Sequence, residues 1–473
     1  MSGPISLEPG GPERDTLAPR SAVPRQPRRR PRWALDDAAL AAVLPRRGPD
    51  EQAVNALAAE LADAVGPAVH PYEVAALLEA DGMPASLIKE RYGHRDLFSL
   101  ATALYERVPR TFPEPPPPTD PWRPDTVRCL LRGLLFALPA LAYLLTAPLW
   151  PVQRYAPALV VAGIASWAWG QALGHRAHLR LATGRREASA TLLTGSLLGT
   201  ATATALAVPF AADAAALALA AGQSLYLAGA GVLLVLARER LLLAALGPLV
   251  AGAAVLPWWE PGPAVRITLP VLALAATWTA AGRVLWTDRA AAGANGVPRP
   301  RLLSSVPYGL FGFAAAVLVM LLGRGQPYTV IALTLSMGPA EWLLYRYRGW
   351  SVAALRASAT PTGFLLRSTG VLALCLGAYL LLLLPAAVLT GSGPGTLLPL
   401  AAALWTALLL QAFGIAWPPA LLCLAAAGTA AAGALPGPPP APAAPLLPLA
   451  CAAAAVCLTA CAIRLLGRPS PHA

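Results

Sequence analysis

The sequence predicts an all-α polytopic membrane protein of about twelve transmembrane helices in two six-helix halves, behind a small cytosolic α-helical N-terminal domain. Of its 473 residues, 56% are hydrophobic and 13% charged. The mean hydropathy is +0.55, which is too apolar for a soluble protein whose surface must be wetted. Apolar segments of about 20 residues, the length that crosses a bilayer, recur along most of the chain. Arginines gather in alternate loops between these segments, as the positive-inside rule requires.

The N-terminal region is polar and falls into three predicted parts. Residues 1–32 combine prolines with arginines and contain no apolar core, so we expect a disordered arm and no secretory signal peptide. Residues 33–108 predict a cytosolic helical domain. Residues 109–126, with four consecutive prolines, predict a stiff Pro-rich linker to the membrane.

The helical domain is predicted from apolar residues at helical spacing behind residues that start helices. Asp50 and Asp96 are expected to cap the first and last helices, because their side chains can accept from the free N–H groups of a first turn. Pro71 and Pro84 are expected to open two helices between them. A domain of this size would suit the recruitment of a cytosolic partner.

The membrane part is expected to run in two halves, residues 127–287 and 306–468, around a central cytosolic loop at 288–305 and before a tail at 469–473. A re-entrant hairpin over 396–435 is an alternative to two spans there, because the connection carries no charge. The expected spans lie near 130–149, 155–174, 188–210, 214–236, 241–258, 264–286, 306–323, 328–345, 368–390, 396–413, 415–435 and 445–466.

Loop charges orient these spans. One set of loops holds most of the arginines, and the other set holds Arg154, Asp213, Glu260 and Arg324. The rule that basic loops stay in the cytosol therefore predicts that both termini are cytosolic. Arginine outnumbers lysine 35 to one, which indicates GC-rich coding and a bacterial source. We therefore expect the protein in the bacterial cytoplasmic (inner) membrane.

Glu341 is the strongest candidate for a functional residue. It is the only acidic residue well within an expected span, and Gly338 and Pro339 before it can interrupt the helix. A carboxylate beside a broken helix can face a cation, a proton or a substrate hydroxyl. The alternative is a structural pair with Arg346 or Arg348 near the cytosolic edge.

Four further residues are candidates for lining a polar cavity. Arg324 is expected on the outer side, where it would meet an anionic group such as a phosphate or a uronic acid, or anchor the helix at the interface. Gln171, Gln223 and Gln411 are amides within spans. Each would line the cavity or hydrogen-bond between helices.

Several function classes are not supported by the sequence. Walker, HExxH and GxSxG motifs are missing, and the first outer loop, residues 150–154, has no carboxylate that could serve a polyprenyl-sugar glycosyltransferase as base, so we expect no catalytic residues. The six cysteines lie in apolar segments without ligand spacing, so neither a metal nor a cofactor is expected. Basic residues are scattered at helix ends, which excludes nucleic acid as a partner.

The segment Val306–Phe313, with the sequence VPYGLFGF, opens the second half and is similar to the opening helix of some bacterial polysaccharide exporters. The twelve-span layout with both ends inside also resembles flippases that move lipid-linked oligosaccharides. This resemblance implies a transporter that exports a saccharide-bearing or amphipathic cargo by alternating access. Two alternatives stay open: a scaffold whose domain 33–108 recruits a partner, and a membrane-embedded enzyme of envelope polysaccharide synthesis. A polar cavity between the halves would favour transport, and a tightly packed apolar bundle would favour the scaffold.

The orientation can be checked by labelling. A cysteine introduced within residues 391–395 is expected to react with a membrane-impermeant maleimide in intact cells, because this loop is predicted to face outward. Reaction only after permeabilisation would show that the orientation is inverted.

Overall fold

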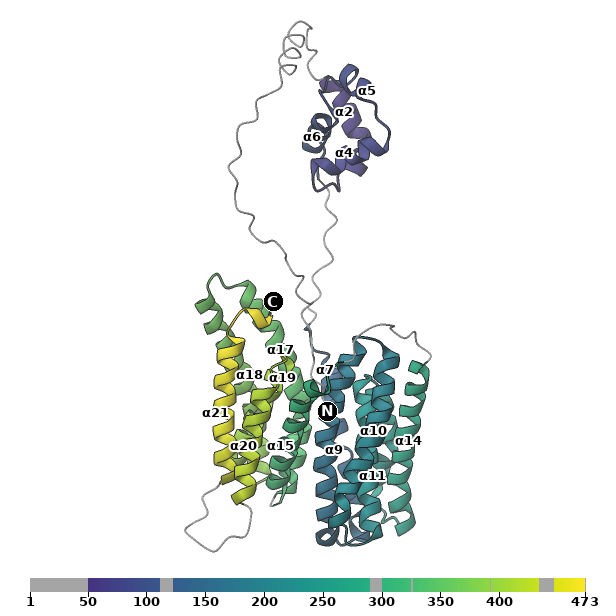
Figure 1. Cartoon of the computed structure of the whole chain (residues 1–473), viewed down its shortest axis with the longest axis vertical. Helices are drawn as coiled ribbons and strands as arrows, with labels where there is room; N and C mark the ends of the chain where they lie inside the picture. The colour runs from purple at the N-terminus through teal and green to yellow at the C-terminus, as the bar shows by residue number, and fades with distance from the viewer. Residues whose placement is uncertain are drawn as a thin grey trace. The chain divides into compact units, whose positions relative to one another are not determined.

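The computed structural model describes residues 50–110, 122–289, 300–324, 326–391, 393–433 and 446–472, and every regular element within these ranges is helical. The predicted all-α class is confirmed for this part of the chain. The chain divides into two compact units, one of residues 12–120 and another that includes residues 121–473 (Figure 1). The expectations for the arm at 1–32, for most of the Pro-rich linker and for the middle of the central loop lie outside the described residues.

Within its described residues, the smaller unit packs five helices around its own apolar core. They are α2 (Glu51–Glu60), α3 (Ala62–Val65), α4 (Pro71–Ala80), α5 (Ala85–Glu90) and α6 (Leu97–Arg107). The side chains of Val54, Leu78 and Leu100 in this core are fully buried. Asp50 and Asp96 cap α2 and α6 as predicted, and the backbone N–H of Ser99 donating to Asp96 holds the pKa of this carboxyl below its usual value.

The larger unit contains nine segments, within its described residues, that are long and apolar enough to cross a membrane. This is the architecture of a multi-pass membrane protein. The segments are α7 (Thr126–Ala137) continued by α8 (Ala140–Thr146), then α9 (Val152–Leu181), α10 (Arg185–Ala207), α11 (Ala214–Val235), α14 (Pro263–Arg289), α15 (Val306–Gly323), α18 (Pro361–Leu389), α19 (Pro394–Ala412) and α21 (Leu446–Leu466).

The three other expected spans have a different form. The segment expected at 241–258 consists of α12 (Glu239–Ala245) and α13 (Gly247–Val255), and the segment expected at 328–345 consists of α16 (Pro327–Leu335) and α17 (Met337–Arg356). The segment expected at 415–435 is the shorter apolar helix α20 (Trp417–Gly433). The count of twelve therefore stays a prediction, whereas nine segments of the described residues are long and apolar enough to cross a membrane.

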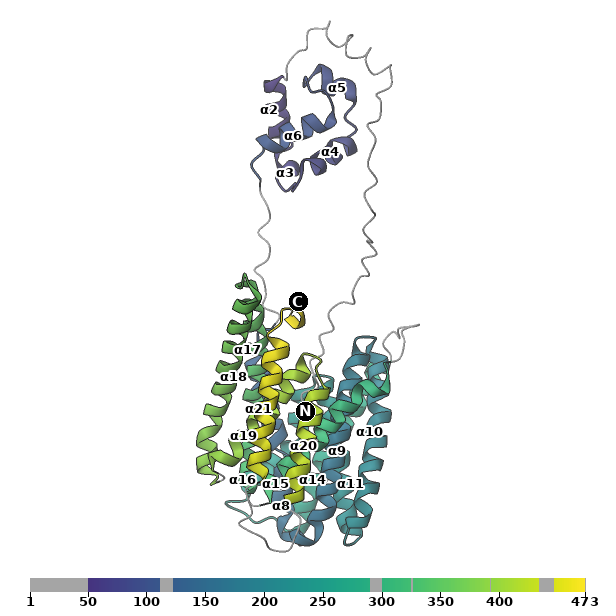
Figure 2. The same cartoon turned by 60° about the vertical axis from the view of Figure 1, so that its left-hand side comes forward.

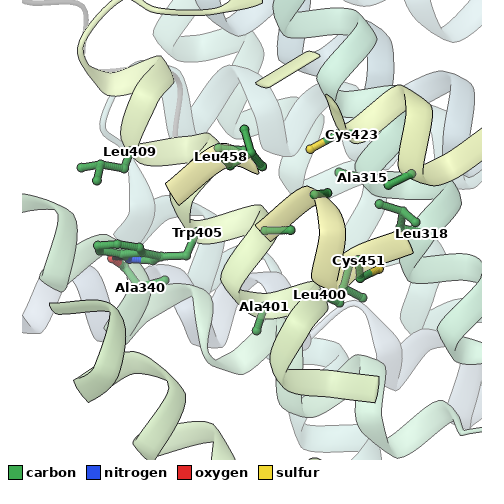
Figure 3. Close-up of a cluster of buried hydrophobic side chains, with 14 of the residues drawn as sticks. Ala315, Leu318, Ala340, Leu400, Ala401, Trp405, Leu409, Cys423, Cys451 and Leu458 are labelled. Carbon is green, nitrogen blue, oxygen red and sulfur yellow. Dashed lines mark hydrogen bonds between the residues drawn. The ribbon is translucent and has the colours of Figure 1, made fainter. Parts of the chain in front are cut away.

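The membrane unit contains two helical bundles with separate cores. The first bundle, α7 to α14, buries an apolar cluster around Leu233 and Leu246, and the second bundle, α15 to α21, buries one around Trp405 (Figures 1 and 2). Figure 3 shows the second core, in which Leu318 of α15, Trp405 of α19 and Leu458 of α21 come from helices far apart in the sequence.

Small residues bring the bundles into contact along α9 and α15. A Cβ added at Gly309 would lie 3.2 Å from the Cβ of Ala172, and one added at Gly312 would lie 3.2 Å from the Cα of Ala168. Beside this contact, the ring of His175 stacks on Tyr308 with centroids 3.8 Å apart. Close approach of helix backbones through small residues is a common means of packing in membranes.

A second glycine contact joins α7 to the junction of α16 and α17. A Cβ added at Gly133 would lie 2.7 Å from the carbonyl oxygen of Leu335, and one added at Gly338 would lie 2.7 Å from the carbonyl oxygen of Cys129. Both distances are to backbone atoms, which cannot rotate away. Only glycine therefore permits this crossing of the two bundles.

The substitution Gly338→Ala tests this contact. Its methyl group must push α7 away from α17, so we expect a loss of about 1–3 kcal/mol, the usual cost of overpacking. The measurement is the thermal denaturation midpoint of the purified protein in detergent. The matched control is Gly370→Ala in α18, where an added Cβ meets nothing within 4 Å, and where alanine should be neutral or slightly stabilising. Equal midpoints for both variants would contradict the crossing.

Candidate functional site

Four charged side chains form a cluster between the bundles, of which Glu239 and Glu341 are buried, Arg132 is largely buried and Arg128 is partly exposed. Arg132, whose side chain is 13% exposed, lies at its centre. Its Nη1 donates to Oε1 of Glu341, and its Nη2 lies 2.8 Å from Oε1 of Glu239. Arg128, which is more exposed, places its Nε 2.8 Å from the same oxygen of Glu239. These residues, Arg128, Arg132, Glu239 and Glu341, are called the Arg–Glu cluster below.

The Arg–Glu cluster is assembled from three interrupted helical segments. The arginines lie on α7, Glu239 begins α12, and Glu341 lies in the second turn of α17. Each interruption comes one to three residues before a proline, namely Pro139, Pro248 and Pro339. Proline lacks a backbone N–H and its ring crowds the carbonyl of the preceding turn, so it favours a break at these points.

The second bundle fixes the position of Glu341. At the break before α17, the hydroxyl groups of Ser336 and Tyr379 lie 3.0 Å apart. The indole N–H of Trp405 donates to the carbonyl of Ala340, at 3.2 Å, and Figure 3 shows the two residues side by side. Trp405 is itself 1% exposed. The carboxylate of Glu341 is therefore held at a set position facing α7.

The charges of the Arg–Glu cluster balance, with two cations and two anions. Breaking a buried pair by removing one partner costs about 3–5 kcal/mol, because the other charge stays buried without compensation. The contact between Arg132 and Glu341 also joins the two bundles. This ion pair can hold the two bundles together, and it can release them when either charged side chain binds another counter-charge.

Glu341 therefore has a partner that the sequence did not indicate. The alternative of a local pair with Arg346 or Arg348 is wrong, because Glu341 pairs with Arg132. The guanidinium of Arg346 lies 4.8 Å from the ring centre of Trp342, and the guanidinium of Arg348 lies 4.9 Å from the ring centre of Phe413.

The other predicted site residues do not join the Arg–Glu cluster. Gln223 accepts a hydrogen bond from the Tyr143 hydroxyl at 2.6 Å and donates to the carbonyl of Leu159 at 3.2 Å, which is a structural bridge between helices. Gln411 is 3% exposed, and its amide nitrogen has no partner among the described residues. Arg324 is exposed at the end of α15.

Gln171 lines a small cavity inside the first bundle, whose wall is mostly apolar and carries a few hydroxyl groups. This cavity, of about 30 Å³, lies between α9, α10 and α11 and is called the hydroxyl cavity below. The polar side chains that line it are Ser166, Gln171, Ser196, Thr200 and Ser224. The hydroxyl groups of Ser166 and Ser224 lie 3.0 Å apart, whereas those of Ser196 and Thr200 have no partner among the described residues. Buried hydroxyl groups usually have one, so these two indicate room for a further polar group.

Sequence reasoning missed the partners of Glu341. Arg132 falls inside the span expected at 130–149, and Arg128 lies four residues before it on the same helix face, which is a readable signal of a charged face. Glu239 lies just before the span expected at 241–258. The position of Glu239 in the sequence did not indicate a buried residue, because charged residues are common at the ends of membrane spans.

A second buried acid was also missed. Asp288 is 7% exposed near the end of α14. Its carboxylate accepts from the Ser189 hydroxyl at 3.3 Å and lies 3.6 Å from the guanidinium of Arg185. This pair connects α10 and α14 within the first bundle, so it stabilises that bundle and does not contribute to the Arg–Glu cluster.

Comparisons with models of protein families, with curated proteins and with solved structures find no match to this chain. The similarity of Val306–Phe313 to polysaccharide exporters therefore stays a prediction. Within the described residues, no group of three or more His, Cys, Asp or Glu side chains could hold a metal ion.

The Arg–Glu cluster can be tested by a double-mutant cycle. Arg132→Met should lower the free energy of unfolding by about 3–5 kcal/mol, because it leaves the Glu341 carboxylate buried without a counter-charge. Glu341→Met should lower it less, because Arg132 keeps its contact with Glu239. The double variant should recover most of the loss seen in Arg132→Met, since Glu239 keeps Arg128 and two apolar side chains replace the pair. Denaturant titration in detergent gives the three values. Additive losses would show that the two residues do not interact.

Arg154→Ala is the matched control for these variants. Its guanidinium lies 3.4 Å from Asp213 in a pair whose arginine side chain is 59% exposed. An exposed pair contributes about 0–1 kcal/mol. The control should therefore unfold almost as the unaltered protein does.

Proposed function

We propose that this chain is a flippase-like transporter of the bacterial inner membrane that exports a saccharide-bearing or amphipathic molecule by alternating access between its two bundles. Both termini would be cytosolic, in accordance with the loop charges. The observation that carries the proposal is the buried contact of Arg132 in the first bundle with Glu341 in the second.

The location of this contact supports movement of one bundle against the other. Interrupted helices in transporters supply free backbone groups and pivots near a substrate site, and the Arg–Glu cluster lies on three such segments. A charge pair is a bistable element, because its partners are either in contact or need another counter-charge. We propose that the cluster closes one end of the pathway and opens during each cycle.

The hydroxyl cavity supports a cargo with polar, uncharged groups. It lies among helices that are long and apolar enough to cross a membrane, and it is lined by serine, threonine and glutamine side chains set among apolar ones, without any charged residue. Gln171 reaches from this cavity to the contact between the bundles, because a Cβ added at Gly312 of α15 would lie 2.7 Å from its Cγ. A change in the α9–α15 contact would therefore alter the cavity.

A membrane scaffold is the second candidate function, and two observations favour it. The glycine contacts around Gly133 and Gly338 hold the bundles close together, as a fixed anchor would require. In the smaller unit, Val69, Tyr72 and Phe98 are 64%, 68% and 57% exposed, and the rings of Tyr72 and Phe98 meet edge to face with centroids 5.8 Å apart. Exposed apolar side chains that gather in this way can bind a partner protein.

A disulfide between the bundles separates the two functions. The Cβ of Ala172 lies 3.2 Å from the position of a Cβ at Gly309, close to the spacing of about 3.5–4.5 Å that a disulfide spans. The double variant Ala172→Cys with Gly309→Cys should therefore cross-link on oxidation and lock the bundles. If transport requires the bundles to move, the transport rate should fall at least about tenfold when the cysteine pair is oxidised and recover when it is reduced. If the protein is a scaffold, oxidation should leave the binding of its partner unchanged.

The measurement uses proteoliposomes that contain a fluorescent glycosyl lipid, with dithionite as the quencher of the outer leaflet. The two single-cysteine variants, oxidised in the same way, control for side reactions of the native cysteines. An unaltered protein that moves this lipid no faster than empty vesicles contradicts a glycosyl-lipid cargo. A locked protein that is as fast as the reduced one contradicts alternating access between the bundles.

A further inference from the structure

Trp169 lies in the middle of α9 and fills a recess on α10. A Cβ added at Gly199 would lie 2.3 Å from Cδ1 of its indole ring, and the indole N–H donates to the carbonyl of Gly195 at 2.8 Å. Gly195 and Gly199 are four residues apart, so they share one helix face. Two glycines at this spacing often bring helix backbones together, but here they make room for a large side chain.

The hydroxyl cavity lies on one side of this ring. Ser196 follows Gly195 in the sequence, is 1% exposed, lines the cavity and has no hydrogen-bond partner among the described residues. Thr200 presents a second hydroxyl group without a partner there. A buried polar group without a hydrogen bond costs about 1–3 kcal/mol, so this wall of the cavity favours a ligand that can supply hydrogen bonds.

An apolar groove lies on the other side. Its volume is about 420 Å³, within the range of small-molecule sites. Trp169 and Gly199 line both the groove and the hydroxyl cavity, so the indole ring is a shared wall. The side chains along the groove include Val161, Ile164, Leu206, Phe210 and Phe313. It therefore joins two helices of the first bundle to α15 of the second.

We propose that the hydroxyl cavity and the apolar groove form one binding site for a single-chain amphipathic molecule with an uncharged, hydroxyl-bearing head. The head would hydrogen-bond to Ser196 and Thr200, and the hydrocarbon chain would lie along the groove towards Phe210. Trp169 divides the two parts and must turn aside for the head to enter. Identifying this ligand as the cargo rests on the proposed transport function, whereas its binding does not.

The chemistry of the walls selects this ligand. Neither the cavity nor the groove is lined by a charged side chain, and burying a charged head without a counter-charge would be costly. The groove belongs to segments that cross the membrane, where a hydrocarbon chain is the available apolar group. With Trp169 in place, the cavity of about 30 Å³ holds only about two water molecules. The ring must therefore move before a glycerol or sugar head fits.

Photolabelling tests the site on the full chain in lipid vesicles. The probe is a monoacylglycerol with a diazirine at the end of its chain. We expect saturable labelling of the α10 segment around Leu206 and Phe210, and competition by unlabelled monoacylglycerol. Non-saturable labelling equal to that of Leu381 and Leu382, which are 70% and 53% exposed on α18, would overturn the proposal, because it would show only contact with bulk lipid.

Ser196→Ala tests the position of the head. It should weaken competition by monoacylglycerol about three- to tenfold, the effect of losing one hydrogen bond. The matched control is Thr194→Ala on the same helix, whose exposed hydroxyl bonds only to its own helix backbone. An unchanged affinity in Ser196→Ala would overturn the proposal, because the cavity would then hold only water.

The role of Trp169 is tested separately, by the rate at which an N-alkylmaleimide dissolved in the membrane modifies Ser196→Cys. Adding Trp169→Ala should raise this rate at least about tenfold, and adding Trp169→Phe, which keeps an aromatic ring but lacks the indole N–H and its hydrogen bond, should raise it less. Equal rates in all three proteins would overturn the division of the site by Trp169. Since no flux is measured in these experiments, a failure of transport and a failure of binding are distinguishable.

Discussion

The burial of one positive charge constrains the membrane part of this protein more than any other interaction. A charged side chain buried in a protein is costly unless an opposite charge pairs with it. Arg132 is 13% exposed on a segment that is apolar enough to cross the membrane, so it must have counter-charges nearby. Glu239 and Glu341 supply them from two other helical segments. The positions of α7, α12 and α17 are therefore coupled to one guanidinium group, and so is the contact between the two bundles.

Interrupted helices and glycines make this arrangement sterically feasible. An uninterrupted helix cannot change direction to direct its end at a neighbour, and each of the three segments breaks just before a proline. The backbones of α7 and α17 then approach so closely that only Gly133 and Gly338 fit at the crossing. Gly133 is the residue after Arg132, and Gly338 lies three residues before Glu341. The close approach of the two helices at these glycines therefore also sets the distance between the two charges. Packing and electrostatics thus depend on the same few residues.

The Arg–Glu cluster and the hydroxyl cavity of the first bundle differ in physical character. The Arg–Glu cluster is balanced in charge and satisfied, so it holds helices together. The hydroxyl cavity leaves the Ser196 and Thr200 hydroxyl groups without partners, so it favours binding. Trp169 stands between that cavity and an apolar groove, supported by its hydrogen bond to the Gly195 carbonyl. Gln171 connects the cavity to the contact between the bundles, because it lines the cavity and its Cγ lies 2.7 Å from the position of a Cβ at Gly312.

The sequence by itself determined the helical class, the multi-pass build and the helix starts at Asp50 and Asp96, because hydrophobic periodicity, segment length and capping are local properties. It also singled out Glu341, since a carboxylate inside an apolar span is costly wherever it lies. Only the tertiary structure decided that its partner is Arg132, some 209 residues earlier in the chain, and that Gln171 lines a cavity whereas Gln223 bridges helices. Such pairings depend on which helix faces meet. Hydropathy describes one segment at a time and carries no information on contacts between segments.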